Sequence, residues 1–342
     1  MSRVSLFAAL AMLLAAVLTA CGGGGTQQVV IYSPHGEEIL GPIEVAFETA
    51  YPEIDLVYLN LPTAKCSARI RAESNNPQCD VWWGGPSGEF ITAEQAGLLA
   101  PYAPSWINHA TADTRSPSNS WHSNWRTPEV ILYNSTRVSA EESPKDWDDV
   151  LDPKWTGRVV IRDPLQSGTM KTIYGAMILR AGNEDAGFDW LRKLDKQNGG
   201  EYAGNPEIMF SILKGGGADV TLWNMADGYI QRETNGLPLA WNVPTSGTPV
   251  LLEGIAIVKN APNRSGAETF FEWVTSAEQL ADQSHRFHRI PIERADLDRA
   301  ALPQWMREQN IMPMEIDWVA FAEQSTRWLE RWKNEVRGSG AN

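Results

Sequence analysis

Strands and helices alternate along the first part of the chain, and this alternation limits the fold more than any other feature. Residues 29–32 form an apolar, β-branched run that predicts a strand, and residues 38–49 carry apolar side chains at helical spacing. The same patterns predict strands at 54–59 and 80–83 and helices at 64–73 and 89–96. Such alternation indicates an α/β fold with a mostly parallel sheet, in which ligands gather at the carboxyl ends of the strands.

The N-terminus has the features of an export signal. Arg3 precedes an apolar segment, 6–17, that is too short to span a bilayer as a permanent helix. The segment ends in Leu18-Thr19-Ala20-Cys21, which matches the lipobox of bacterial lipoproteins, although an ordinary secretory signal is the alternative. We therefore expect a signal peptide at 1–20, a lipidated Cys21 and a glycine-rich tether at 21–27. The expected location is the periplasmic or outer face of the bacterial inner membrane.

The remaining chain is long enough for two lobes. Residues 101–128 are rich in Ser, Asn, Pro and Trp and predict a loop that crosses between lobes. Strands are expected at 130–133, 158–161, 219–223, 250–252 and 255–258, with helices at 147–151, after 166, at 206–214 and from 265 onward. About 320 residues exceed what one core normally supports. The expected first lobe is 28–125 with 247–300, and the second is 126–246 with the C-terminal helices of 301–342.

Charge and cysteine content narrow the partners. A net charge of −13 argues against a nucleic-acid partner or an anionic membrane surface. It leaves a small anionic ligand open, because backbone amides and a few side chains set the local field of a pocket. With Cys21 lipidated, Cys66 and Cys79 are left as a pair in an oxidising compartment, which predicts a structural disulfide between them.

Neither catalysis nor metal binding is well supported by the spacing of reactive residues. Ser33 and His35 lie in one turn, which is poor geometry for a nucleophile and its base, and 85–88 misses the G-x-S-x-G pattern by one position. His285 and His288 have a spacing that suits zinc, but no Cys or carboxylate nearby completes the set. A serine hydrolase remains the functional alternative, and we predict no catalytic residue, metal or cofactor.

Three strand ends, each in a polar or glycine-bearing turn before a helix, instead predict a cleft that holds a small anion. Helix N-termini can bind an anion through free backbone N–H groups without a full formal charge. Fifteen tryptophans add ring faces, but strand alternation lets only one of Trp82 and Trp83 reach a ligand. The predicted ligand-binding residues are Ser33, His35, Trp83, Gly84, Gly85, Ser87, Ser167, Gly168, Thr169, Trp223 and Asn224.

With these residues in view, the sequence resembles the extracellular solute-binding proteins of ABC importers, in the branch that includes ferric-iron, hexose-phosphate, phosphonate and thiamine binders. The resemblance covers nearly the whole mature chain and rests on "VVIYSPHGEEI", "NNPQCDVWWGG", "EQAGLLAPY", "VILYNSTRV", "DWDDVLDPKWTGRVVIRDPLQSGT", "GGGADVTLWN" and "MEIDWVAFAEQSTRWLERW". It implies a periplasmic-binding-protein type II fold, with two α/β lobes and a hinged ligand cleft. It also implies a non-enzymatic role beside the permease subunits of an ABC importer, and we expect a monomer.

The resemblance also separates the candidate ligands. Ferric binders hold iron with a His after the first strand, a Glu after the third and a Tyr-Tyr pair in the second lobe. His35 matches the first, but Gly85 stands where the Glu is expected and Ala226 and Asp227 where the tyrosines are expected. Losing both phenolates removes the hard oxygen ligands of ferric iron. The turns at Ser33 and at 167–169 resemble the phosphate-contacting turns of the organophosphate branch, so a phosphorylated sugar or phosphonate is the leading ligand. Iron and neutral sugars are the alternatives, and His35 either contacts the ligand or caps its turn.

Overall fold

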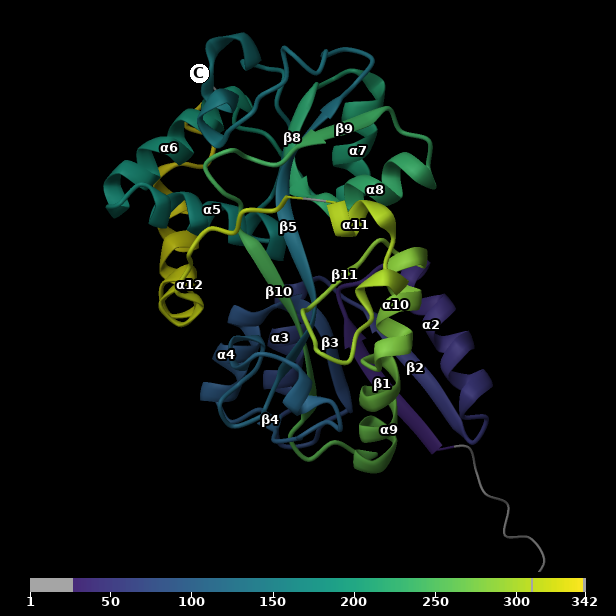
Figure 1. Cartoon of the computed structure of the whole chain (residues 1–342). Coiled ribbons are helices and arrows are strands. Elements are labelled where there is room, and N and C mark those ends of the chain that lie inside the picture. The colour runs from purple at the N-terminus through teal and green to yellow at the C-terminus, as the bar shows by residue number, and fades with distance from the viewer. Residues whose placement is uncertain (1–26, 309, 341–342) are drawn as a thin grey trace, which may run out of the picture.

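A computed structural model describes residues 27–308 and 310–340 (Figure 1). The predicted signal peptide, Cys21 and most of the tether lie outside the described residues. Gln27, which was assigned to the tether, instead begins strand β1. Within the described part of the chain, no helix combines the length and apolar character needed to cross a membrane.

The fold is built on a mixed sheet rather than the mostly parallel one predicted. Its central strands follow the order β11-β5-β10-β3-β1-β2, while β4 pairs with β10 and both β8 and β9 pair with β5. Only β1 with its neighbours β2 and β3 is parallel in this sheet, whereas β10 runs antiparallel to both β3 and β5. The strands are β1 Gln27–Ser33, β2 Ile54–Asn60, β3 Val81–Pro86, β4 Leu99–Ala100, β5 His122–Asn134, β8 Val220–Asn224, β9 Leu239–Asn242, β10 Val250–Val258 and β11 Ile290–Pro291. A separate parallel pair joins β6 Ile161–Arg162 to β7 Tyr202–Ala203.

Three hydrophobic clusters, two in the first lobe and one in the second, divide the described part of the chain into two lobes. The first lobe packs helices α2 Glu37–Ala50, α3 Thr63–Ala72, α4 Ser87–Gln95, α9 Arg264–Val274 and α10 Ala277–Arg286 around β1, β2 and β3. The second lobe contains α5 Gly168–Arg180, α6 Glu184–Gln197, α7 Pro206–Gly215, α8 Met225–Glu233, α11 Gln304–Glu308 and α12 Trp318–Glu335. The long strands β5 and β10 run between the two halves (Figure 1). β5 pairs with β10 along its first part and with β8 and β9 along its second, so the same strand serves both lobes.

Local sequence explains why the second-lobe helices start where they do. Ser167 accepts a hydrogen bond from the Met170 N–H at 3.2 Å and caps α5, and Asn205 caps α7 with Pro206 in the first turn. Such side chains satisfy N–H groups that the first turn of a helix leaves unpaired. α7 then ends at Gly216, whose φ of 75° is the left-handed conformation that favours glycine. These starts match the helices predicted after 166 and at 206–214.

Several predicted boundaries were wrong. Residues 122–128 are not a loop but the first half of β5, in which every residue is buried except the half-buried Arg126, although five of the seven are polar. The two strands predicted at 250–258 are one strand, interrupted by a bulge at Glu253–Gly254. Gly84 and Gly85 belong to β3, with φ of 98° and 103°. The predicted helical region after 265 is interrupted by the segment that carries β11.

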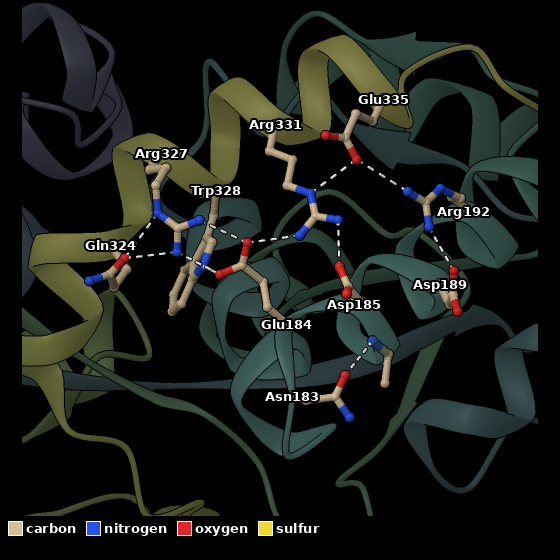
Figure 2. Close-up of polar contacts among 11 residues, drawn as sticks. Asn183, Glu184, Asp185, Asp189, Arg192, Gln324, Arg327, Trp328, Arg331 and Glu335 are labelled. Carbon is tan, nitrogen blue, oxygen red and sulfur yellow. Dashed lines mark hydrogen bonds and ion pairs between the residues drawn. The ribbon is translucent and has the colours of Figure 1, made fainter.

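The C-terminal helix α12 is fastened to α6 by a network of charged side chains (Figure 2). Arg327 and Arg331 each donate to Glu184 at 2.8 Å, and Arg331 also donates to Asp185 at 2.7 Å. The hydrogen bonds from Arg327 contribute most to lowering the pKa of Glu184, to about 2. The start of α12 packs in the other direction against α4 of the first lobe and against α5. The helix therefore touches both lobes.

The predicted disulfide between Cys66 and Cys79 is not formed, because both residues are free thiols. Cys66 donates to the Leu61 carbonyl at 3.4 Å, and Cys79 donates to the Val81 carbonyl at 3.1 Å. Burial raises the pKa of both thiols, that of Cys66 to about 12. Each thiol is thus directed to its own backbone acceptor and held in the protonated form, which is the unreactive one.

Candidate functional site

A cavity of about 340 Å³ lies where the two lobes meet. Its walls come from the ends of β1 and β3, from β5, β6, β8 and β10, and from the starts of several helices. A larger hollow of about 1090 Å³ lies on the second lobe alone, between α5, α6 and the 141–154 segment. We take the interlobe cavity as the candidate site, because it is lined by both lobes and contains most of the residues predicted from sequence.

Six helices in the described part of the chain point their N-termini at this cavity. The second-lobe helices α5, α7 and α8 begin at Ser167, Asn205 and Asn224, and each of these side chains accepts a hydrogen bond from its own first turn. The first-lobe helices α2, α3 and α4 begin at Gly36, Pro62 and Pro86.

Glycine and proline have no side-chain oxygen, so the first-lobe helix starts are not capped by their own N-cap residues. All three of these N-cap residues line the cavity. Helix starts of this kind can offer N-terminal N–H groups to a ligand, and the helix dipoles add a positive potential, although the Glu38 carboxylate lies beside Gly36 at the start of α2. This arrangement suits an anionic group.

Two arginines in the cavity wall add full positive charge. Arg162, on β6, donates from Nη2 to the Gln166 carbonyl at 3.3 Å, and its guanidinium lies 5.5 Å from the ring centre of Trp223. Arg289 is 6% exposed and places Nη2 at 3.1 Å from Oδ1 of Asp227. Among the described residues, the buried Nε of each arginine has no hydrogen-bond partner. The two guanidinium groups therefore place positive charge in the cavity wall, where an anionic ligand can pair with it.

Asp227 forms the polar centre of the second-lobe wall. Its Oδ2 accepts from Trp223 Nε1 at 2.9 Å and from Asn224 Nδ2 at 2.8 Å. Its Oδ1 pairs with Arg289, so the carboxylate is held by groups from both sides of the cavity. Planar side chains in fixed orientations, with Trp223 and Phe210 beside them, can hold the hydroxyl or amino groups and one face of a small organic ligand.

His35 and Glu253 face each other on the first-lobe side. His35 Nε2 lies 3.6 Å from Glu253 Oε2, beyond hydrogen-bond distance, and has no other partner among the described residues. Burial and then the nearby Arg289 lower the pKa of His35 well below its usual value, so the imidazole is neutral at pH 7. Burial raises the pKa of Glu253, although Arg289 and the Thr127 hydroxyl oppose that rise. The His35 ring can thus offer a ligand either a donor or an acceptor.

Seven of the eleven predicted ligand-binding residues line the cavity. They are His35, Gly85, Ser167, Gly168, Thr169, Trp223 and Asn224. The backbone N–H of His35 also donates to Ser33 Oγ at 3.2 Å. His35 thus helps to close its turn through its backbone and lines the cavity, and its contact with a ligand stays a prediction.

The other four predicted residues, Ser33, Trp83, Gly84 and Ser87, lie behind the wall. Ser33 is fully buried and holds the turn by accepting from His35. Trp83 packs in the first-lobe core, 5.2 Å from the His35 ring and 5.8 Å from that of Phe270 between ring centres. Gly84 lies under the His35 ring, where a Cβ would clash, and Ser87 is buried in the first turn of α4. These four residues therefore do not line the cavity, because Ser33, Trp83 and Ser87 are packed into the first lobe and Gly84 lies against the His35 ring.

Sequence reasoning missed Arg162, Arg289, Asp227, Glu253 and Thr63, all of which line the cavity. Arg162 and Thr63 had a usable signal, because each lies at or just before a predicted helix start. Asp227 stands where a metal-binding tyrosine was expected, and its replacement by a carboxylate was itself a sign of a different ligand. Among the described residues, no group of three or more His, Cys, Asp or Glu side chains is placed to hold a metal ion.

Comparison with known proteins agrees with a ligand cleft between lobes. Residues 88–309 match the family model described as bacterial extracellular solute-binding protein. The chain belongs to this family. Its members are solute-binding components of transporters rather than enzymes, and they work outside the cytoplasm with the permease subunits of ABC importers. The family resemblance and the prediction that this solute-binding protein is not an enzyme are therefore confirmed.

Individual relatives differ in what their names say they bind. A probable ABC transporter periplasmic-binding protein of Sinorhizobium fredii is 28% identical over 97% of this chain and 91% of its own. Iron uptake protein A1 of Synechocystis is 26% identical over 79% of this chain and 77% of its own. The structure of the periplasmic binding protein AfuA of Actinobacillus pleuropneumoniae, with fructose 6-phosphate bound, is similar with a TM-score of 0.80 at 23% identity. The alignment with AfuA covers 91% of this chain and 98% of that one, and it confirms the periplasmic-binding-protein fold.

Proposed function

We propose that this protein is the solute-binding component of an ABC importer and captures a small organic phosphate or phosphonate. The observation that carries the proposal is the meeting of three helix starts without side-chain caps with Arg162 and Arg289 at one interlobe cavity. A phosphoryl group has several oxygens, which can accept from backbone N–H groups and from guanidinium donors at the same time. The fructose 6-phosphate found in AfuA is in keeping with this ligand class.

The rest of the cavity suits the organic part of such a ligand. Asp227, Asn224 and Gln231 offer acceptors and donors for hydroxyl or amino groups, and Trp223 offers a ring edge or face. A volume of about 340 Å³ is at the lower end of small-molecule sites, which favours one compact solute. The lobes then close on the ligand by a hinge at β5 and β10, because only the closed form lets both walls touch it.

Ferric iron is a weaker candidate, although some relatives are named as iron-uptake proteins. Iron(III) prefers hard, anionic oxygen ligands, and two of the four carboxylates that line the cavity are already engaged. Asp227 pairs with Arg289, and Glu253 accepts from Thr127. His35 lacks a neighbouring set of oxygen ligands, since Gly85 and Ala226 stand where the family's iron binders have theirs.

The lipid anchor is a separate part of the proposal and rests on sequence. We propose cleavage before Cys21, lipidation of that residue, and attachment of a monomer to the periplasmic or outer face of the inner membrane. Partition of the full-length protein into a detergent phase, lost in Cys21→Ser, would support the anchor. A wild-type chain that stays in the aqueous phase would remove it.

A thermal unfolding panel with residues 22–342 tests the ligand class. The panel contains hexose phosphates, phosphonates, inorganic phosphate, neutral sugars and ferric citrate. A ligand at about a thousand times its dissociation constant adds about 4 kcal/mol of stability, which is readily measured. We expect only the phosphate esters or phosphonates to stabilise the protein strongly.

Arg162→Met is expected to weaken that stabilisation, because it removes the guanidinium beside the start of α5. Arg71→Met is the matched control, since Arg71 is exposed near the far end of α3. Its stabilisation by ligand should equal that of the wild type. Strong stabilisation by ferric citrate alone, or by neutral sugars alone, would contradict the proposed ligand class.

A further inference from the structure

The chain turns sharply between α10 and β11, at His288. This residue has a φ of 53°, in the left-handed region that non-glycine residues rarely adopt. Its ring does not line the cavity, but the next residue, Arg289, does. An uncommon backbone conformation directly before a cavity arginine calls for a physical account.

The ring of His288 is held by aromatic side chains of the second lobe. It stacks on Tyr229 of α8, with ring centres 5.4 Å apart and planes at 30°. Tyr229 in turn stacks on Trp305 of α11 at 3.9 Å and contacts Trp241 of β9 at 4.4 Å. His288 is therefore placed by packing that involves three separate elements.

Arg289 contacts the same helix two residues away. Its Nη2 lies 3.1 Å from Oδ1 of Asp227, which precedes Tyr229 on α8. Its Nη1 lies 3.7 Å from Oε1 of Glu253 on β10, and its guanidinium lies 5.4 Å from the ring centre of Trp125 on β5. Residues 288 and 289 thus contact α8 at Tyr229 and Asp227, respectively. The Arg289 guanidinium also lies beside β10 and β5, so it bridges the second-lobe wall and the two strands that join the lobes.

We propose that His288 is a positioning residue for ligand capture, which fixes the Arg289 guanidinium across the cleft without touching the ligand. An arginine side chain has many rotamers, and restricting them before binding removes an entropic cost from the binding step. The His288 ring sets the backbone from which Arg289 extends, and Asp227 sets the far end. The part of this proposal that concerns affinity rests on the proposed function, whereas the placement of Arg289 does not.

A readout without ligand tests the placement. Arg289 is one of the two causes that lower the pKa of His35, so NMR titration of the His35 ring reports where the guanidinium lies. Glu253, 3.6 Å from Nε2, is the other charged group facing that ring. We expect the His35 pKa to rise in Arg289→Met and to rise in the same direction in His288→Ala. His285→Ala is the matched control. His285 lies exposed in the last turn of α10, and its ring hydrogen-bonds only the Ala301 carbonyl in the described structure, so its removal should leave the His35 pKa unchanged.

A second readout uses binding of fructose 6-phosphate. His288→Ala should weaken binding about tenfold or more, and the double variant with Arg289→Met should bind no more weakly than Arg289→Met alone. The proposal would be overturned if the double variant lost affinity by the product of the two single losses. It would also be overturned if His288→Ala kept the wild-type His35 pKa and the wild-type affinity. His288→Asn keeps a residue that tolerates the left-handed conformation while removing the ring. It should reproduce the rise in the His35 pKa even if His288→Ala does not fold.

The two proposals fail in different ways. If wild-type protein binds fructose 6-phosphate and none of the other panel solutes, the proposed function stands and both readouts apply. If the wild type binds no phosphate or phosphonate, the proposed function falls, and the His35 titration alone decides whether His288 positions Arg289. An unchanged His35 pKa in both His288 variants would then overturn the inference.

Discussion

Lys171 Nζ lies 2.7 Å from Glu89 Oε1, and this ion pair joins α5 of the second lobe to α4 of the first. The side chains are only 17% and 15% exposed. Beside the pair, a Cβ added to Gly168 would lie 2.9 Å from Pro86, so the two lobes are in direct contact at the cavity edge. The structure therefore has its lobes closed together at this side of the cleft.

Breaking this ion pair should favour the open form. Lys171→Met removes the charge but keeps a similar stem, and we expect a larger radius of gyration in small-angle scattering of ligand-free protein. The loss of unfolding free energy should exceed the ~1 kcal/mol typical of exposed ion pairs, because both side chains are largely buried and Glu89 is left without its partner. Lys333→Met, an exposed change on α12, is the control. Scattering identical in Lys171→Met and wild type would show that the pair does not hold the lobes together.

Glu129 should make the protein less stable as the pH rises. It is fully buried on β5 with neither carboxyl oxygen partnered among the described residues, and burial raises its pKa well above 4.5. Because the folded pKa exceeds the unfolded one, its favourable contribution is complete below about pH 4.5 and is lost as the pH rises toward the folded pKa. Asp227 and Glu253 add to the shift in the same direction.

Glu129→Gln removes this titration and should raise the unfolding free energy at pH 7 to 8. We expect denaturant unfolding curves of the variant to lose part of the decline seen with rising pH, by at most about 1.4 kcal/mol per pH unit. Glu141→Gln on the surface should leave the pH profile as in the wild type. A variant less stable than wild type at pH 8 and no better at pH 5 would show that Glu129 is ionised in the folded protein.

Two glycines that face α12 should differ in how much their replacement by alanine changes the stability of the protein. A Cβ at Gly175 of α5 would clash with the Phe321 ring, whereas a Cβ at Gly88 of α4 would meet Ala322 at an ordinary 3.7 Å. Overpacking typically costs about 1 to 3 kcal/mol, so Gly175→Ala should destabilise by that amount and Gly88→Ala should be close to neutral. Thermal melts of the pair measure this difference. Equal melting temperatures would mean that α12 shifts easily and does not constrain α5.

The thiols of Cys66 and Cys79 should be unreactive in the native protein. Burial and their raised pKa predict that Cys66 and Cys79 do not react with a thiol reagent until the chain unfolds. When residues 22–342 are purified without reductant and then unfolded in denaturant, two thiols per chain should react with the reagent. Zero equivalents after unfolding, recovered only by reduction, would show that the pair is oxidised and would restore the predicted disulfide.

Local signals predicted the start of α5 well but not the orientation of the first-lobe wall. The Ser167 cap and the apolar spacing after it are contained in a few neighbouring residues, so the sequence alone was enough. Trp83 could not be placed in the core without knowing which face of β3 is covered by His35 and Phe270. The first half of β5 was predicted as a loop because it is rich in polar residues. His122, Ser123 and Asn124 are nevertheless buried there, by partners distant in sequence.

Arg289 was unpredictable for a related reason. It lies far along the chain from the turns at Ser33 and Ser167, directly before the two-residue strand β11. Only the return of β11 to pair with β5 brings it beside Asp227 and Glu253. Long-range pairing of this kind leaves no trace in local propensity or spacing.

The most direct test of the proposed function is a calorimetric titration of residues 22–342 with two ligands that differ only in a phosphoryl group, fructose 6-phosphate and fructose. The same comparison is made between 2-aminoethylphosphonate and ethylamine, which lacks the phosphonate group. We predict one binding site per chain, saturable binding by at least one of the phosphorus-containing ligands, and no measurable heat from its neutral or cationic counterpart. Equal binding of both members of a pair, or binding of ferric citrate alone, would contradict an anion site at the helix starts.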